Sequence, residues 1–403
     1  MPLPFYHLDN PIQNYAWGSR SAIPEILGLP SPADEPMAEL WMGTHPKAPS
    51  TVRTPDGDVP LGRLIADSPE PILGAETVHR FGAELPYLFK ILAAAAPLSI
   101  QAHPDAVQAA SGFEDENRRG IPLDSPKRNY RDPNPKPECI CALTPFWAMR
   151  GFRAPDAIRE NLDRFCPREG ERLIDALDTG RTASDSLRRF FENLMKADGD
   201  WKPRAIQEAV SSCRQHRADD AAAEWVVKLS DAYPGDVGVL SPLFLHTFRL
   251  EPGDAMFLPA GELHAYLEGV GIELMGNSDN VIRGGLTPKH VAVEELMRIL
   301  TFGSERPEVL DPHPISETES EYPTPATQFK LSVIRVSGKT AHRSSRSRSV
   351  EILLVVNGTC RIESKSPGGE DELIKGDSVL IPAATAAYAL KGNAVVYKAS
   401  VPI

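Results

Sequence analysis

The chain has 403 residues, of which 41% are hydrophobic and 24% are charged, as is ordinary for a globular protein. Its 55 acidic and 43 basic residues give a net charge of -12, which argues against general binding to nucleic acid or to an anionic membrane. No apolar run is long enough to span a bilayer, and the amino terminus lacks the features of a secretory signal. The 5 cysteines form no CxxC pair, so we expect no disulfide framework, no thiolate metal site and a cytoplasmic protein.

The pattern of the sequence changes several times along the chain. Residues 1–152 mix short apolar runs with many prolines and glycines, which is typical of strands joined by irregular loops. Residues 153–235 place apolar side chains three and four residues apart, which predicts a helical insertion. Strands are expected again in 236–303 and in 328–403, separated by an acidic, proline-rich linker at 304–327. The predicted fold is mainly β, and its first and third segments form one discontinuous domain.

One stretch of the third segment, 250–266, has the strongest local signal. Gly253, Pro259 and Gly261 form two turns around a short apolar strand, and His264 begins the next strand. This order is similar to the second sequence motif of the cupins, which are jelly-roll-like β-barrels whose mouth can hold a metal ion. The spacing therefore predicts that His264 is a metal ligand rather than an isolated buried histidine.

The same stretch is repeated near the carboxyl end of the chain. Residues 250–260 align with residues 373–383. The repeat predicts a second cupin-like barrel in 328–403. Its position equivalent to His264 is Ala387, so we expect this barrel to be metal-free and structural.

Polar side chains share one face on three of the expected strands, because alternate residues of a strand point to the same side. Burying so many polar groups is costly unless they bind an ion or pair with one another. The groups are Ser99, Gln101 and His103; Lys136 and Glu138; and His264 and Tyr266.

Four of these residues supply a set of metal ligands, namely Gln101, His103, Glu138 and His264. Two imidazoles, one carboxylate and one amide oxygen suit Zn²⁺, and other divalent ions stay open. Each motif alone is weak, since Q-x-H is common and the Lys-Pro-Glu segment could be an exposed turn. Cys139 and Cys141 lie on the opposite strand face and are expected to be packing residues.

A candidate anion site follows the second motif. Arg283 precedes two glycines that allow the backbone to approach a ligand closely. Thr287, followed by proline, predicts the N-cap of a helix that runs to about Leu300, with Lys289 in its first turn. A helix N-terminus beside Lys and Arg is suited to phosphate. The spacing leaves open a second role, in which Arg283 pairs with Asp279 as a brace of the loop.

Together these motifs resemble the type I phosphomannose isomerases, also called mannose-6-phosphate isomerases. The resemblance covers nearly the whole chain, including the helical insertion and the second barrel. Two departures are visible: Pro135 stands where many members have histidine, and Ala292 stands where an aspartate is usual. Neither falls on a ligand position. The matching segments are 15–18, 39–46, 99–105, 136–138, 258–266 and 277–290.

The resemblance implies a zinc enzyme, with one Zn²⁺ per chain, that interconverts mannose 6-phosphate and fructose 6-phosphate. The expected partner is a small sugar phosphate, and the chain is expected to be a monomer that binds neither nucleic acid nor membrane. By matched position the zinc ligands fall on Gln101, His103, Glu138 and His264, and the family's essential arginine falls on Arg283. The substrate pocket is implied for Ser99, Lys136, Tyr266, Glu273 and Lys289, to which we add Asp279 as a substrate-binding residue.

Two routes interconvert an aldose and a ketose: proton transfer through a cis-enediol, and hydride shift. The hydride route usually employs two metals held by several carboxylates, whereas the motifs supply one metal and one carboxylate, which favours the enediol. Arg283 is expected to stabilise the developing oxyanion, and Lys289 and Ser99 to hold the phosphate. Either Glu273 or Lys136 would be the base, and the sequence does not choose between them.

Three other functions stay open at this stage. A cupin-type glucose-6-phosphate isomerase would be a second isomerase, and an iron-dependent dioxygenase would use a redox metal with open coordination positions. A sugar-binding or storage cupin would carry out no chemistry. That last class leaves the charged residues around the metal unexplained.

Overall fold

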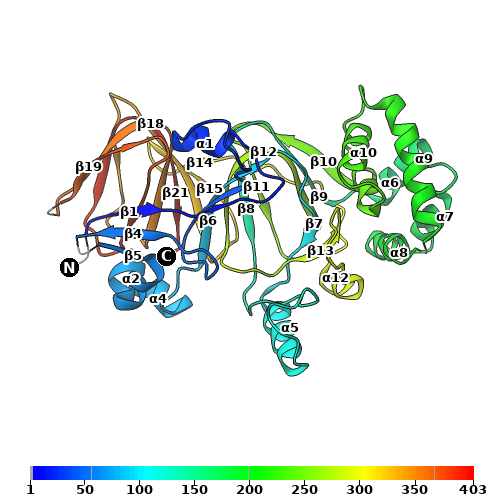
Figure 1. Ribbon diagram of the computed structural model, residues 1–403, viewed down its shortest axis with the longest axis horizontal. Coiled ribbons are helices and arrows are strands. Elements are labelled where there is room, and N and C mark those ends of the chain that lie inside the picture. The colour runs from blue at the N-terminus through cyan, green and yellow to red at the C-terminus, as the bar shows by residue number, and fades with distance from the viewer. Residues whose placement is uncertain (1–2, 56, 198, 367) are drawn as a thin grey trace.

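The computed structural model describes residues 3–55, 57–197, 199–366 and 368–403. The molecule is elongated, with a block of helices at one end and two β-rich parts beside it (Figure 1). The mainly β fold with a helical insertion is thereby confirmed. The described strands pair into two large sheets, and no closed barrel is identified among them. Among the described helices, none combines the length and the apolar character that a membrane span requires.

The first sheet has 10 strands and is built around β12. This strand pairs with β6, β7, β8 and β9 along its 13 residues, so it brings four other strands together. The strands are β2 (Ile12–Gln13), β3 (Glu39–Met42), β6 (Tyr87–Ala94), β7 (Ile100–Ala102), β8 (Glu138–Ala142), β9 (Phe146–Phe152), β10 (Leu245–Leu250), β11 (Ala255–Leu258), β12 (His264–Gly276) and β13 (Ile282–Gly285).

The second sheet has 11 strands and takes segments from both ends of the chain. β1 joins it through β20, so three amino-terminal strands extend a sheet made mostly by 328–403. The stretch expected as a linker, 304–327, contains two short strands of this sheet, and the domain boundaries themselves stay a prediction. The strands are β1 (Tyr6–Asp9), β4 (Thr51–Thr54), β5 (Gly57–Pro60), β14 (His313–Pro314), β15 (Glu319–Tyr322), β16 (Lys330–Val336), β17 (His342–Arg343), β18 (Glu351–Ser364), β19 (Glu370–Ile374), β20 (Ser378–Ile381) and β21 (Tyr388–Ser400).

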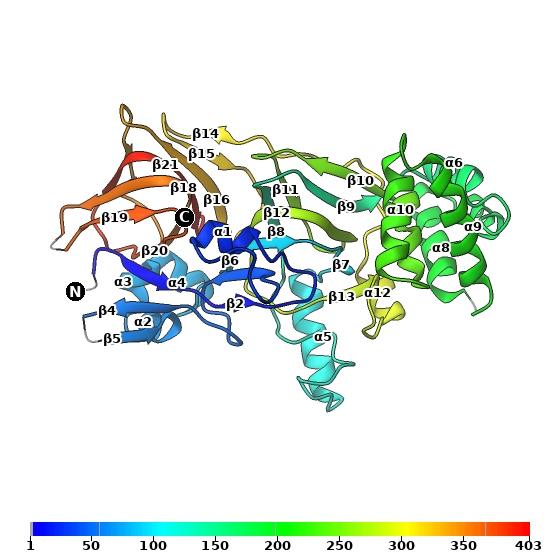
Figure 2. The same cartoon turned by 45° about the horizontal axis from the view of Figure 1, so that its top comes forward.

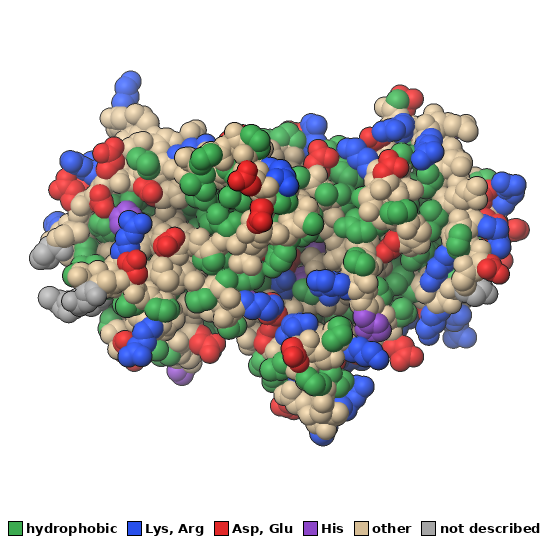
Figure 3. All heavy atoms as spheres, in the orientation of Figure 1, with side chains coloured by type: hydrophobic (Ala, Val, Ile, Leu, Met, Phe, Trp, Pro, Cys, Tyr) green, Lys and Arg blue, Asp and Glu red, His purple; other side chains and the backbone are tan. Residues whose placement is uncertain are grey.

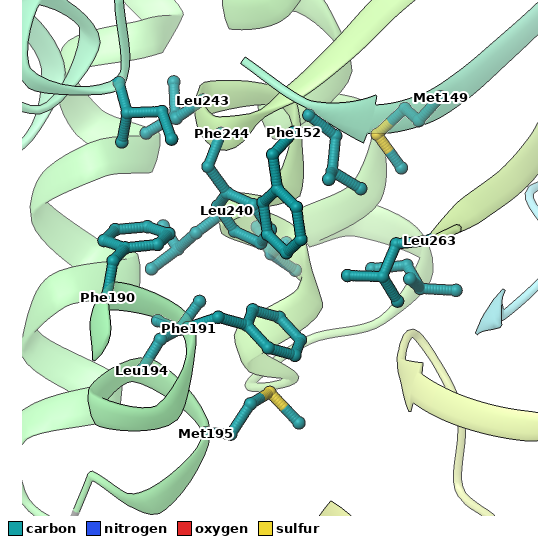
Figure 4. Close-up of a cluster of buried hydrophobic side chains, with 14 of the residues drawn as sticks. Met149, Phe152, Phe190, Phe191, Leu194, Met195, Leu240, Leu243, Phe244 and Leu263 are labelled. Atoms are coloured by element: carbon teal, nitrogen blue, oxygen red, sulfur yellow. The ribbon is translucent and has the colours of Figure 1, made fainter. Parts of the chain in front are cut away.

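The helical insertion consists of α6 to α10 and packs against the end of the first sheet. Its apolar faces form a core with β9 and α11, in which the Phe152 and Phe191 rings lie 5.4 Å apart (Figure 4). α5 projects from the body of the molecule (Figure 2). The helices are α1 (Ala22–Leu27), α2 (Leu61–Asp67), α3 (Pro69–Leu73), α4 (Ala75–Phe81), α5 (Ala106–Arg118), α6 (Pro155–Phe165), α7 (Glu171–Asp178), α8 (Ala183–Lys196), α9 (Trp201–His216), α10 (Ala221–Ala232), the 3-10 helix η1 (Val237–Leu240), α11 (Ser241–Phe244) and α12 (Val293–Ile299).

The helix predicted from Thr287 begins later than expected. α12 starts at Val293, and the residues before it form a turn. The Thr287 hydroxyl accepts a hydrogen bond from the Lys289 N–H (3.1 Å), which closes this turn instead of capping a helix. Lys289 therefore lies in a loop, and the prediction that it stands at a helix N-terminus is wrong.

The two sheets share one apolar core. Side chains of the first sheet such as Phe89 and Ile272 are completely buried, and so are Ile352 and Leu380 of the second sheet in the same cluster. Cys139 and Cys141 also lie in this core, which confirms the prediction that they are packing residues. The second sheet therefore supports the back of the strands whose front face carries the predicted site.

The second sheet keeps a buried carboxylate at the place of a predicted metal ligand. Glu351 pairs with Ile381, just as Glu138 pairs with Leu258 in the repeated motif of the first sheet. Here Lys398 lies 3.4 Å from the Glu351 carboxylate, and the Tyr388 hydroxyl donates to it (2.9 Å). Arg348 lies 3.9 Å from the same carboxylate, and Lys398 also contacts Glu319 (2.5 Å).

The shared core generates a prediction about stability. Replacing the fully buried Ile352 with Ala should lower the free energy of unfolding by about 2–5 kcal/mol, because it leaves a cavity between the sheets. The measurement is urea unfolding followed by fluorescence. Ile374→Ala is the matched control, since Ile374 is 54% exposed and its removal should change stability little. Equal losses for both variants would contradict the shared core.

Candidate metal centre

Three predicted ligands converge at the start of β12. His103 follows β7, Glu138 begins β8 and His264 begins β12, and their ligand atoms all lie within 4.8 Å of one another. The three side chains are 0–2% exposed. Since metal sites bring nitrogen and oxygen ligands together in this way, the cluster is a candidate metal centre.

The spacing of the three side chains fits a divalent ion. His103 Nε2 lies 3.2 Å from one Glu138 oxygen, and His264 Nε2 lies 3.4 Å from the other. Ligands of a tetrahedral zinc stand about 3.4 Å apart at zinc–ligand distances of about 2.0–2.2 Å. His103 Nε2, His264 Nε2 and Glu138 Oε2 are buried without a hydrogen bond in correct geometry. An ion would satisfy all three atoms, which otherwise carry an uncompensated desolvation cost.

Backbone carbonyls fix the orientation of both imidazoles. His103 Nδ1 donates to the carbonyl of Asn280 (2.6 Å), and His264 Nδ1 donates to the carbonyl of Glu262 (3.0 Å). A carbonyl oxygen can only accept, so Nδ1 of each ring carries a proton. This leaves the lone pair of each Nε2 facing the centre, as a metal ligand requires.

The protonation states also suit a cation. Burial lowers the pKa of His103 to about 4, so its ring is neutral near pH 7. Burial would raise the pKa of Glu138, but the charge of Lys136 holds it well below its usual range. Lys136 Nζ lies 3.1 Å from the Glu138 carboxylate. Glu138 is therefore a buried carboxylate ion.

Gln101 and Arg283 flank the centre through strand pairing. Gln101 lies opposite His264 in the β7–β12 ladder and opposite Arg283 in the β7–β13 ladder. Side chains of directly opposed residues share a face, so all three point to the same side. Gln101 is thus next to the three clustered side chains, and its role as a fourth ligand stays a prediction.

A pocket of about 440 Å³ opens in front of the centre. His103 and His264 are too deeply buried to line it. The space-filling view shows basic side chains gathered in the middle of the molecule, above α5 (Figure 3). The lining includes the predicted residues Ser99, Gln101, Lys136, Glu138, Tyr266, Glu273, Asp279, Arg283 and Lys289.

The sequence analysis missed a buried ion network in the pocket wall. Lys90 Nζ lies 2.9 Å from Glu273 and 3.6 Å from Glu39, and the Trp41 indole donates to Glu39 (2.5 Å). Burial opposes the charge of Lys90, but the two carboxylates raise its pKa overall, whereas burial raises the pKa of Glu273. The sequence does contain one signal of this network, a single lysine within the apolar strand β6. Because side chains alternate along a strand, Lys90 points to the face opposite Phe89.

Part of the pocket lining is cationic. Arg131, Arg283 and Lys289 line it, and within the described ranges none of them has an acidic ion-pair partner. Asp279 instead binds Lys47 (2.8 Å) and lies 3.4 Å from His45, so a brace between Asp279 and Arg283 is absent from the described contacts. Burial and the charge of Arg131 lower the pKa of Arg283. Unpaired cations in a pocket favour an anionic ligand.

Comparison with known proteins gives one consistent result. Family models match residues 5–155 (phosphomannose isomerase type I, catalytic domain), 167–245 (its helical insertion domain) and 318–400 (mannose-6-phosphate isomerase, cupin domain). The chain is 40% identical to mannose-6-phosphate isomerase of Shigella flexneri over 388 residues, covering 96% of this chain and 97% of the relative. The bovine (Bos taurus) protein of the same name is 33% identical and covers 94% of this chain.

Solved structures agree over the whole chain. A zinc-bound mannose 6-phosphate isomerase superposes with a TM-score of 0.89 at 35% identity and full coverage of both chains. A mutant phosphomannose isomerase from Salmonella typhimurium gives a TM-score of 0.91 at 35% identity, again with 100% of each chain covered.

The geometry of the centre predicts how it responds to loss of one ligand. His264→Ala should lower the affinity for a divalent ion strongly, because it removes one of the three converging ligand atoms. Metal content after dialysis against a weak chelator, measured by mass spectrometry, tests this. His313→Ala in exposed β14 is the matched control and should keep its metal. Equal metal content in both variants would remove His264 from the site.

Proposed function

Because the chain belongs to the type I phosphomannose isomerase family, we propose that it is a zinc-dependent mannose-6-phosphate isomerase. The observation that carries the proposal is one pocket that holds a candidate metal centre and, in its lining, three cations without an acidic partner among the described residues. A sugar phosphate has the matching chemistry, since its carbonyl and hydroxyl oxygens suit the metal and its phosphate suits the cations. The pocket volume of about 440 Å³ is within the range of small-molecule sites.

Gln101, His103, Glu138 and His264 would hold the zinc ion. When bound, zinc supplies a Lewis acid that polarises the sugar carbonyl and acidifies the neighbouring carbon. Only one candidate metal cluster is found in the described part of the chain, and it contains one carboxylate. This supports proton transfer through a cis-enediol over a hydride shift.

Arg283 would act on the reacting oxygens rather than on the phosphate alone. Arg283 and His264 both lie opposite Gln101, so one strand, β7, separates Arg283 from the predicted ligand His264. A guanidinium there can donate hydrogen bonds to an oxygen that becomes negative as the enediol forms. Lys289, at the exposed rim of the pocket, and Ser99 would bind the phosphate.

Two residues stay candidates for the base that moves the proton between C1 and C2. Glu273 is buried, its pKa is raised by burial, and it is held by Lys90 at 2.9 Å. Lys136 lines the same pocket but contacts the ligand Glu138. A buried carboxylate with a raised pKa can accept a carbon-bound proton, whereas Lys136 could do so only after losing the proton that pairs it with Glu138.

Proton NMR of the enzyme with mannose 6-phosphate in D₂O tests the reaction. We expect fructose 6-phosphate to form with deuterium at the exchanged carbon, and chelation beforehand to stop the reaction. Isomerisation without deuterium would favour hydride shift or a shielded proton over the open enediol. Absence of isomerisation with zinc present would overturn the proposal and direct attention to glucose 6-phosphate, oxygen consumption or passive sugar binding.

Two cation variants separate chemistry from binding. Arg283→Ala should lower kcat by a factor of about 100 or more, because it removes charge stabilisation in the transition state. Lys289→Ala should mainly raise KM for mannose 6-phosphate, since it removes a contact made before and during the reaction. Lys375→Ala, in the exposed turn after β19, is the control and should match the wild type. Near-normal turnover of Arg283→Ala would remove Arg283 from the mechanism.

A further inference from the structure

Two loops at the side of the pocket are hydrogen-bonded to each other. One loop, 131–134, leads to β8, and the other, 277–280, leads from β12 to β13. The Ser278 hydroxyl donates to the carbonyl of Asn134 (3.1 Å), and the Asp279 N–H donates to the Asp132 carboxylate (2.7 Å). The two loops therefore form one unit.

Asn280 is the centre of this unit and is completely buried. Its Oδ1 accepts from the N–H groups of Arg131 (2.7 Å) and Asp132 (3.3 Å). Its Nδ2 donates to the carbonyls of Asp132 (2.8 Å) and Asn134 (3.0 Å). Its own carbonyl accepts the 2.6 Å hydrogen bond from His103. One residue thus holds a candidate metal ligand with its backbone and the neighbouring loop with its side chain.

The loop that Asn280 holds carries groups for both parts of the pocket. Arg131 lines the cationic side beside Arg283. A few residues further on, Lys136 and Glu138 lie at the metal centre. Movement of the loop would displace Arg131 and, through Asn280, would also disturb the ring of His103.

We propose that Asn280 is a positioning residue that couples occupancy of the metal site to binding of the substrate phosphate. The identity of the anion rests on the proposed function, whereas the link from the loop to His103 does not. Coupling between two binding sites is reciprocal, so a bound sugar phosphate should tighten metal binding as much as metal tightens sugar phosphate binding. A purely structural residue would affect stability without creating this mutual dependence.

The test compares zinc affinity of the wild type and Asn280→Ala, measured by competition with a chelating indicator, with and without saturating fructose 6-phosphate. We expect fructose 6-phosphate to raise the zinc affinity of the wild type. In Asn280→Ala the zinc affinity should fall by about 10–100-fold, as is usual when the partner of a ligating histidine is disturbed. The effect of fructose 6-phosphate should be weaker than in the wild type, because only the direct contact of the sugar oxygens with zinc remains, and KM should rise even at saturating zinc.

Asn129→Ala is the matched control. Its side chain donates to Glu116 (3.1 Å) on α5, in the same segment, and should leave zinc affinity and its dependence on fructose 6-phosphate unchanged. If thermal melting shows that Asn280→Ala does not fold, Asn280→Asp takes its place, since it keeps the size and Oδ1 while losing the donor to Asp132 and Asn134.

Two results would overturn the coupling: zinc affinity of the wild type that does not respond to fructose 6-phosphate, or a response in the Asn280 variant that is as large as in the wild type. Wild-type isomerase activity is measured in parallel. If the wild type is active and either result is found, only the proposed role of Asn280 is contradicted. If the wild type is inactive, the proposed function is contradicted. The zinc affinity of the Asn280 variants then still decides whether this residue positions His103.

Discussion

Burial of one face of β6, β8 and β12 against the second sheet is the interaction on which the rest of the structure depends. The apolar residues of these strands, such as Phe89 and Ile272, fill the shared core. Strand alternation then turns Lys90, Glu138 and Glu273 to the opposite face. A shift of one residue in any ladder would exchange the two sets, placing charges in the core. The same packing that stabilises the fold therefore fixes which polar groups face the pocket.

Much of the site could be predicted because its signals are local. The turn glycines and the proline around His264, and the alternation that pairs Lys136 with Glu138, are readable in short windows, and the structure brings His103, Glu138 and His264 together. Strands and helices could also be predicted from short windows, because the spacing of apolar residues indicates which face of each element is buried. The class of fold was predictable for this reason, whereas the pairing of amino-terminal strands with the second sheet depends on contacts far apart in sequence.

The parts that escaped prediction depend on tertiary partners. Lys90 is the one charged residue in the apolar strand β6. Its contact with Glu273, which lies far away in the sequence, explains why a buried lysine is tolerated there. Asn280 lies within the matching segment 277–290, where the sequence gives it no separate role. Its hydrogen bonds to the loop 131–134 become visible only in the folded structure. The helix predicted to begin at Thr287 is absent there because the Thr287 hydroxyl accepts a hydrogen bond that closes a tight turn. A threonine can make this bond or an N-cap bond, and the sequence pattern does not distinguish the two.

The carboxylate of Glu351 shows the same buried position without histidines beside it. Each carboxylate has a lysine nearby, Lys136 at 3.1 Å from Glu138 and Lys398 at 3.4 Å from Glu351. The difference is that Glu138 faces two imidazoles, whereas Glu351 accepts a hydrogen bond from Tyr388. The first copy therefore leaves three buried ligand atoms without a hydrogen-bond partner among the described residues, whereas the Glu351 carboxylate is contacted by side chains of its own sheet. Loss of an ion would therefore expose unsatisfied atoms in the first copy only, and the core that the two sheets share would keep the first copy attached to the second.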